Sequence, residues 1–399
     1  MSNTAISVAT IMLGIAVGTQ TLGRSLEPNS GIRALEVPGK AWAVTPTGQD
    51  GLAVLAGGSS GRGQSGIGQF GLVACKLSPA LHPNELKGVS WTRAGQVIDL
   101  FPDYPSIMTA ATCTGESAII VVIEMQGGAT FFQLGRITEA DIFGSTGRAA
   151  SAADVLSALE EKVAWKDIAF IDYCGAKQDS FLSVLHFPSV ACFEKEIFLA
   201  GQSYYPGKVE EEAVWVGKLT DTKGRRLTGY LLGRGWAPAL VEYEGELYCL
   251  AIEASWVGHR GDWEEFRGKI IGWVSADGRA WRQWQGSVGA ENVARVDACA
   301  AGGSIFVACL CEDEGGALKI RVFRMVSGVA AADEVCEMAL GGQGKPAKVV
   351  AVRAVGSGVW VFWEEQLGSK RMLYCRQAWA KPADDSSGKG ALPHARETN

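Results

Sequence analysis

The stretch Ala237–Glu253, APALVEYEGELYCLAIE, decides the fold because it reads as two short strands joined by a tight turn. Val241–Tyr243 and Leu247–Leu250 have the composition that strands prefer, and Glu244-Gly245 fits a two-residue hairpin turn. Related stretches recur at Lys40–Gly58, Tyr104–Ile123, Phe187–Gly201, Val293–Cys309 and Ala347–Trp363. The chain is therefore expected to repeat one β-hairpin unit.

Each copy is followed by a further strand that ends in a basic, an apolar and a hydroxyl residue, or in a variant of that pattern. These ends read Lys76-Leu77-Ser78, Arg136-Ile137-Thr138, Lys218-Leu219-Thr220, Trp273-Val274-Ser275, Arg324-Met325-Val326-Ser327 and Arg376-Gln377-Ala378. The last three ends lie about 50 residues apart, a spacing that fits one four-stranded sheet per repeat. The repeat predicts an all-β chain that forms a six-bladed β-propeller.

The repeat spacing stretches between Thr138 and Thr220, and we place a small insertion at about residues 142–184. Within it, Ser151–Asp167 has apolar residues at helical spacing and is expected to form a helix. The segments 168–175 and 180–187 are expected to form a hairpin. A degenerate seventh blade in this interval is the alternative, so a seven-bladed propeller stays open.

The last copy has its third strand at Met372–Ala378, and polar sequence follows it. Because an open sheet edge invites aggregation, an N-terminal strand is expected to complete the last blade and close the propeller. Either Ala5–Val17 or Gly31–Val37 can supply that strand. Residues 1–380 are thus expected to form one propeller domain, and the polar tail 381–399 is expected to be disordered.

A short motif within Trp273–Trp281, WVSADGRAW, points to a family. The motif is Ser275-x-Asp277-Gly278-x-x-Trp281. Ser and Asp side chains can bond a turn backbone, glycine tolerates the turn dihedrals, and tryptophan can fill the space between sheets. Inside a β repeat, this motif resembles the shorter form of the Asp-box hairpin of sialidase-like propellers. The resemblance concerns architecture, and it implies that Asp277 serves the fold.

The same resemblance implies what a catalytic member of the family would need. Sialidases use three arginines for the substrate carboxylate, a tyrosine–glutamate pair and an aspartate acid. Arg33 is the nearest match to their early Arg-Ile-Pro motif, and it lacks the proline. Arg234, Arg295 and Arg353 lie in no recognisable motif. We therefore assign no catalytic residue, and a sialidase-like glycoside hydrolase remains an alternative.

Candidate ligand-binding residues lie in the segments that join strands and neighbouring blades, because function concentrates on loops carried by a rigid scaffold. Three such segments place aromatic residues next to charged ones: Gln202–Glu212, Thr228–Trp236 and Glu253–Gly268. The candidates are Tyr204, Tyr205, Arg234, Trp236, Trp256, His259, Arg260, Asp262 and Trp263. Such a set suits a sugar or a protein hot spot, and packing between loops is the alternative.

Composition excludes other partner classes. A net charge of −6 gives no overall attraction to nucleic acid or anionic membrane. Ala5–Val17 is too short to span a bilayer comfortably, and no basic residue precedes it as in a signal peptide. The ten cysteines lie mostly in strand-like runs and are expected to be buried and reduced, which slightly favours a cytoplasmic protein. Cys309-x-Cys311 lacks zinc spacing, so no metal or cofactor is expected.

The sequence thus predicts a non-catalytic β-propeller that binds a protein partner or a carbohydrate through one face. A structural subunit of a larger assembly is a further alternative, and the oligomeric state stays open. The functional part of this prediction depends on analogy of fold.

Overall fold

All regular elements that the structure describes are β-strands. The computed structural model describes residues 33–37, 40–46, 51–58, 69–76, 89–92, 107–114, 117–126, 129–138, 166–169, 171–173, 186–205, 208–219, 227–260, 263–326, 330–340, 350–367 and 370–380. These ranges contain no helix. Hence none of them contains a helix that could cross a membrane.

Two sheets form from the first part of the chain, and in each of them consecutive strands pair antiparallel. One sheet has the order β2 (Lys40–Pro46), β3 (Gly51–Gly58), β4 (Gln69–Lys76) and β5 (Val89–Thr92). The other has the order β6 (Ile107–Thr114), β7 (Ser117–Gln126), β8 (Ala129–Thr138) and β9 (Lys166–Ala169).

The middle of the chain forms a five-stranded sheet and a larger composite sheet. The first has the order β10 (Ile171–Tyr173), β14 (Leu227–Arg234), β13 (Lys208–Leu219), β12 (Glu196–Tyr205) and β11 (His186–Phe193). The composite sheet contains β15 (Trp236–Tyr243), β16 (Glu246–Arg260), β17 (Trp263–Ser275), β18 (Arg282–Gln283), β19 (Val293–Ala301), β20 (Ser304–Glu312), β21 (Leu318–Met325) and β22 (Asp333–Ala339). Its two halves, β15–β18 and β19–β22, are joined through the single pair Gly268↔Val293.

The last sheet brings the two ends of the described chain together. It contains β23 (Val350–Val355), β24 (Gly358–Leu367), β25 (Lys370–Ala380) and β1 (Arg33–Val37). Strand β1 pairs antiparallel with β25, from Arg33↔Cys375 to Val37↔Arg371. The other candidate for this position, Ala5–Val17, and the tail 381–399 lie outside the described residues.

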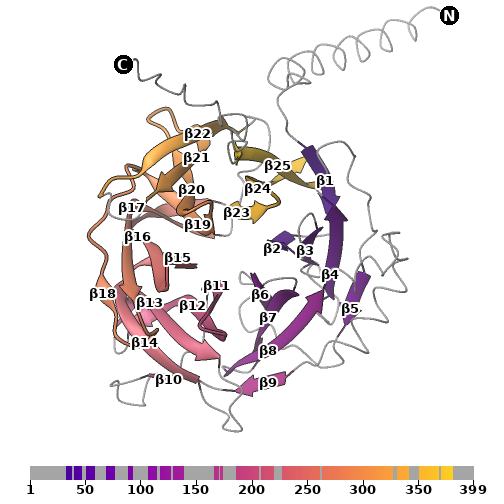
Figure 1. Ribbon diagram of the computed structural model, residues 1–399, viewed down its shortest axis with the longest axis vertical. Coiled ribbons are helices and arrows are strands. Elements are labelled where there is room, and N and C mark those ends of the chain that lie inside the picture. Colours follow the sequence, from indigo (N-terminus) through magenta and orange to yellow (C-terminus); the bar gives the residue numbers. More distant parts are fainter. Residues whose placement is uncertain are drawn as a thin grey trace, which may run out of the picture.

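The sheets are arranged around a centre, with the first strand of each repeat innermost (Figure 1). Neighbouring inner strands contact one another in the order β2, β6, β11, β15, β19, β23 and back to β2. The six signature ends and their variants all fall within the last five residues of a third strand or directly after it, namely β4, β8, β13, β17, β21 and β25. The repeat in the sequence therefore corresponds to equivalent strands in successive sheets.

The expected insertion at 142–184 corresponds in part to strands of the neighbouring sheets. Strand β9 pairs antiparallel with β8, and β10 pairs parallel with β14. Of the hairpin predicted between 168–175 and 180–187, residues 168–169 pair with β8 and 171–173 with β14, and most of the second arm lies outside the described residues. Lys166 and Asp167, which we expected at the end of a helix, belong to β9; the rest of that helix lies outside the described residues.

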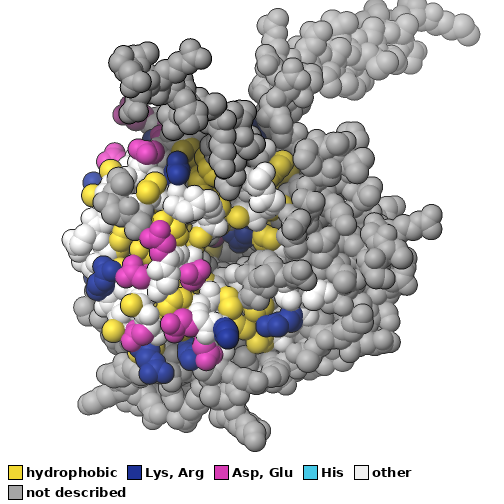
Figure 2. Space-filling view, in the orientation of Figure 1, with side chains coloured by type: hydrophobic (Ala, Val, Ile, Leu, Met, Phe, Trp, Pro, Cys, Tyr) yellow, Lys and Arg dark blue, Asp and Glu magenta, His cyan; other side chains and the backbone are white. Residues whose placement is uncertain are grey.

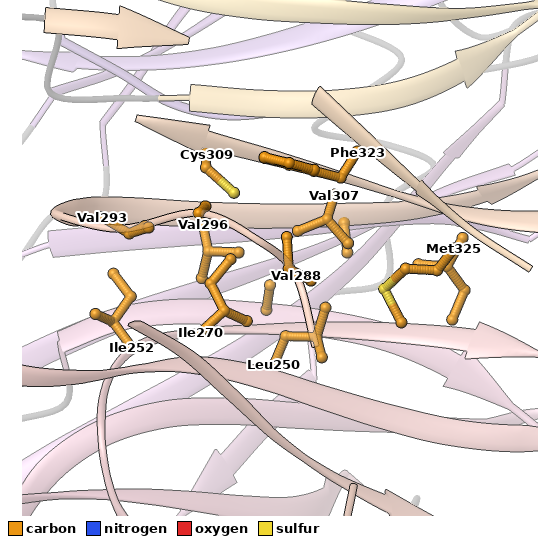
Figure 3. Packing of buried hydrophobic residues seen from close by; sticks show 14 of the residues in the cluster. Leu250, Ile252, Ile270, Val288, Val293, Val296, Val307, Cys309, Phe323 and Met325 are labelled. Atoms are coloured by element: carbon orange, nitrogen blue, oxygen red, sulfur yellow. The ribbon is translucent and has the colours of Figure 1, made fainter. Parts of the chain in front are cut away.

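The deciding stretch forms the predicted hairpin, with β15 and β16 joined at Glu244-Gly245. Both turn residues have positive φ, 51° and 74°, as a tight two-residue turn requires. Leu250 and Ile252 of β16 and Ile270 of β17 pack against Val296 and Val307 of the next repeat (Figure 3). Burial of such apolar side chains between neighbouring sheets holds the repeats together.

Candidate binding face

The β16–β17 hairpin extends far beyond its inner neighbour. Pairing between β15 and β16 ends at Trp236↔Ile252, whereas β16 and β17 stay paired to Arg260↔Trp263. The extension is about 25 Å long at roughly 3.3 Å per residue. We expected Glu253–Gly268 to be a loop, and that expectation is wrong, because backbone hydrogen bonds with a cross-strand partner continue along both arms.

The β12–β13 hairpin is a shorter version of the same arrangement. Pairing between β11 and β12 ends at His186↔Gln202, and β12 and β13 stay paired to Tyr205↔Lys208. The expected loop 202–212 is therefore mostly strand as well. Since β11 and β15 are neighbours and run in the same order within their repeats, both hairpins extend from the same face of the ring.

Most of the predicted site residues lie on these two hairpins. Tyr204 pairs with Glu212, Trp256 with Phe266 and His259 with Glu264, while Tyr205, Arg260 and Trp263 form the last pairs before each tip. The structure describes the backbone of these residues and not their side chains, and Asp262 lies outside the described residues. The backbone thus brings the candidates to two adjacent hairpins, and their side-chain contacts remain a prediction.

Arg234 and Trp236 differ in burial. Arg234 is exposed at the end of β14, whereas Trp236 of β15 is only 6% exposed and belongs to the apolar core cluster that also contains residues of β19. Trp236 is therefore a packing residue and offers no surface platform, which corrects its place among the predicted ligand-binding aromatics.

A stack of three side chains lies where the inner strands begin. The Phe187 ring is 4.9 Å from the Trp236 ring, and the Arg295 guanidinium carbon is 4.3 Å from the Phe187 centroid and 5.8 Å from that of Trp236. These residues come from β11, β15 and β19, so the stack joins three consecutive repeats. We did not predict it. Aligning the copies at their turns places Arg295 level with Phe187, a signal that would have found the pair.

Two polar contacts lie beside this stack, at the base of the hairpins. Arg267 of β17 donates to Glu312 of β20 through Nη2 at 2.8 Å and Nε at 3.1 Å. The backbone N–H of Ala237 donates to the buried Gln202 side-chain oxygen at 3.4 Å. These contacts connect each hairpin base to the next repeat along the chain.

The 275–281 turn lies at the other end of β17. Asp277 Oδ1 accepts the backbone N–H groups of Arg279 and Ala280, each at 2.8 Å, and the Ser275 hydroxyl at 3.0 Å. Hydrogen bonds from Ala280 and Arg279 hold the pKa of Asp277 below its usual value. Gly278 has φ of 68°, and a Cβ there would lie 2.3 Å from the Phe198 ring of β12. Trp281 packs against the cluster that contains Phe198.

The buried thiols are unsuited to nucleophilic chemistry. Burial raises the pKa of Cys311 to about 11 and that of Cys249 well above its usual range, so both stay protonated at neutral pH. All seven cysteines with described side chains are free thiols. Among the described side chains, no group of three acidic, His or Cys residues is placed to hold a metal ion.

The face of the molecule seen in Figure 2 carries charges of both signs. Acidic and basic side chains are interspersed over the part of the face that Figure 2 colours. Val326, at 37% exposure, is the one large hydrophobic residue that is exposed among the described side chains.

Comparison with known proteins places this geometry in a structural class. No family model and no curated protein matches the sequence. Among solved structures, Trypanosoma rangeli sialidase matches 87% of this chain with a TM-score of 0.55 at 10% identity. A Dyadobacter fermentans protein of unknown function matches 87% of this chain and 99% of its own length, with a TM-score of 0.50 at 10% identity.

The chain has a sialidase-like β-propeller architecture, as the sequence motif suggested. It spans 59% of the length of the trypanosomal sialidase. At this level of identity the likeness concerns the fold alone, because fold and chemistry are separable.

Proposed function

We propose that the chain is a six-bladed propeller closed by β1 and that it acts as a non-catalytic binding module. Six blades are supported by the cycle of contacts among the inner strands β2, β6, β11, β15, β19 and β23. The assignment of β9 and β10 to the outer edges of two adjacent sheets argues against a seventh blade in that interval. The pairing of β1 with β25 supports closure.

The observation that carries the binding proposal is the β16–β17 hairpin. It continues well past β15 on the face where propeller hairpins and links meet, and it holds Trp256, His259, Arg260 and Trp263. A second hairpin with Tyr204 and Tyr205 rises from the adjacent sheet. Aromatic residues beside charged ones suit the planar face of a sugar or a protein hot spot.

Arginine contacts support a binding role in preference to hydrolysis. Arg353 bonds Asp297 and the Val44 carbonyl, and Arg295 stacks on two aromatic rings. Both guanidinium groups are thus engaged within the fold, whereas a carboxylate-binding triad needs arginines that present their donors to a ligand. The Asp277 turn, whose carboxylate bonds the turn backbone, is proposed to be the Asp-box, with a role in folding.

A glycan array with the purified full chain tests this proposal, together with hydrolysis of a fluorogenic sialoside. We expect glycan binding without turnover, and at least a tenfold loss of binding in Trp256→Ala and Arg260→Ala. Arg282→Ala is the matched control, because Arg282 lies at the opposite end of β17 and pairs with Glu246 on the surface. Turnover of the sialoside would overturn the non-catalytic proposal.

Absence of glycan binding would reject the carbohydrate ligand and leave a protein ligand as the form to test. Binding of proteins captured by the wild-type chain is then measured with the same three variants. Loss of that binding in Trp256→Ala and Arg260→Ala, with binding retained in Arg282→Ala, would support the proposed face. Equal capture by all variants would reject the face itself.

A further inference from the structure

Arg295 spans three repeats at the face from which the hairpins extend. It belongs to β19, its guanidinium carbon lies over the Phe187 ring of β11, and the Trp236 ring of β15 lies next to both. The Nη1 group also donates to the Ala294 carbonyl at 2.6 Å, which anchors the side chain to its own strand. A planar guanidinium over an aromatic ring gains both electrostatic and stacking energy.

The stack lies at the base of both extended hairpins. Trp236 pairs with Ile252, the last residue of β16 that an inner strand covers, and β16 then continues alone with β17. Phe187 follows His186, whose partner Gln202 is the last covered residue of β12. Phe187 and Trp236 therefore lie at the positions on β11 and β15 beyond which the two hairpins extend without an inner neighbour.

Each hairpin needs support at its base to hold a defined direction. A two-stranded hairpin is marginally stable in water by itself, because each strand has only one neighbour. At the base of the β16–β17 hairpin, Arg267 of β17 pairs with Glu312, and Ile252 of β16 pairs with Trp236 of β15. On β12, Gln202 accepts the Ala237 N–H from the neighbouring inner strand.

We propose that Arg295 is a positioning residue of the binding face, which fixes the direction of the two hairpins by clamping Phe187 and Trp236. This inference rests on the proposed function for its biological meaning, because it concerns how the same face is preorganised. Preorganisation of this kind increases affinity by lowering the cost of ordering on binding. Arg295 itself is not required to touch the ligand.

Hydrogen exchange on the ligand-free full chain tests the clamp. In Arg295→Ala we expect about tenfold faster exchange in 253–260 and 202–205, the size of one well-formed cation–π contact, and unchanged exchange in β24 and β25. Arg353→Ala is the matched control, because it removes an inner-strand arginine from the β23 side of the ring. It should speed exchange around β23 and leave the hairpins unchanged.

The conservative variants separate positioning from general stability. Arg295→Lys keeps the charge and loses the planar stack, so it should show most of the Arg295→Ala effect on the hairpins. Phe187→Leu removes the aromatic ring that Arg295 contacts. It tests the role of this contact in ordering the hairpins if Arg295→Ala does not fold. Hairpin exchange equal to wild type in Arg295→Lys and Phe187→Leu would overturn the clamp.

Ligand binding is a separate readout. If a glycan or protein ligand is found, Arg295→Lys should weaken it about threefold to tenfold while leaving the Tm close to that of wild type. Faster hairpin exchange with no ligand for the face would keep the clamp and reject the proposed function. Ligand loss in Trp256→Ala with unchanged exchange in Arg295→Lys would keep the function and reject the clamp.

Discussion

The two junctions made by β19 differ although they use the same strand. Toward β15, Val296 and Ala298 pack into an apolar cluster with Val241. Toward β23, Asp297 pairs with Arg353, and its carboxylate accepts the Val352 N–H at 2.9 Å. Successive residues of a strand point to opposite sides, so adjacent positions in the sequence serve different neighbours.

The difference shows that one repeat can contact its two neighbours through different interactions, apolar packing on one side and hydrogen bonds with an ion pair on the other. The apolar junction depends on area removed from water and tolerates small shifts. The polar junction is directional, and Arg353 Nε also donates to the Val44 carbonyl of β2 at 2.5 Å, so that one side chain links three inner strands. At the β11–β15 junction, Ser189 accepts the Leu240 N–H at 2.9 Å in the same way.

The largest expected effect is at the polar junction. Asp297→Ala leaves the mostly buried Arg353 charge without its carboxylate, and we expect a loss of about 3 kcal/mol in the free energy of unfolding. Urea unfolding followed by tryptophan fluorescence measures it. Asp297→Asn, which keeps an acceptor for Val352, should lose less. A loss below about 1 kcal/mol in Asp297→Ala would mean that the Asp297–Arg353 pair contributes no more than a solvent-exposed ion pair.

A smaller effect is expected one residue earlier. Val296→Ala removes two methyl groups from the apolar cluster and should cost about 1–2 kcal/mol in the same unfolding measurement. If Val296→Ala destabilises more than Asp297→Ala, the contrast between the two junctions is wrong.

The third prediction concerns the polar contact within the apolar junction. Tyr243 of β15 donates its hydroxyl to the Gly303 carbonyl of the next repeat at 2.9 Å. Tyr243→Phe should cost about 1 kcal/mol, because it removes one hydrogen bond and keeps the ring. The neighbouring pair supplies a control, since the Tyr248 hydroxyl bonds Glu246 within its own strand, and Tyr248→Phe should cost less.

The smallest effect is a pH dependence in the sheet that carries Arg353. Burial raises the pKa of Glu365, and the Trp363 indole N–H, which donates at 3.0 Å, offsets this only in part. A raised pKa means that the folded state holds the proton more tightly, so stability falls as pH rises through the unfolded and then the folded pKa. Glu365→Gln should therefore be more stable than wild type at pH 7 and equal to it at about pH 3. Equal Tm values at both pH values would contradict this.

Much of the fold was readable because it repeats. Apolar runs such as Leu247–Leu250, turns such as Glu244-Gly245 and the third-strand ends are local signals, and the structure places them as expected. Within the interval 142–184, Lys166 and Asp167 were expected in a helix and belong to β9, and the pairing of β10 with β14, a strand more than fifty residues later along the chain, was not predicted. A pairing of three residues leaves no periodic signal.

The sequence predicted which residue types form the candidate site, and only partly their burial and secondary structure. Trp236 looks in sequence like Trp256, yet it is buried in the core cluster, where Phe187 of β11 and Arg295 of β19 lie against it. Glu253–Gly268 was predicted to be a loop from its place between two strands, but cross-strand pairing makes 253–260 and 263–268 the two arms of a hairpin. Arg295 was considered only as a possible substrate arginine, since its partners Phe187 and Trp236 come from two other repeats.

By itself, the sequence determined the β repeat, its strand signals and the likeness to sialidase propellers, since these depend on neighbours within a few positions. Only the tertiary structure decided which side of β19 is apolar and which is polar, that Trp236 is covered and that Arg295 joins three repeats. These follow from how sheets meet around the ring, and such contacts join residues far apart in the chain, where local patterns carry no information.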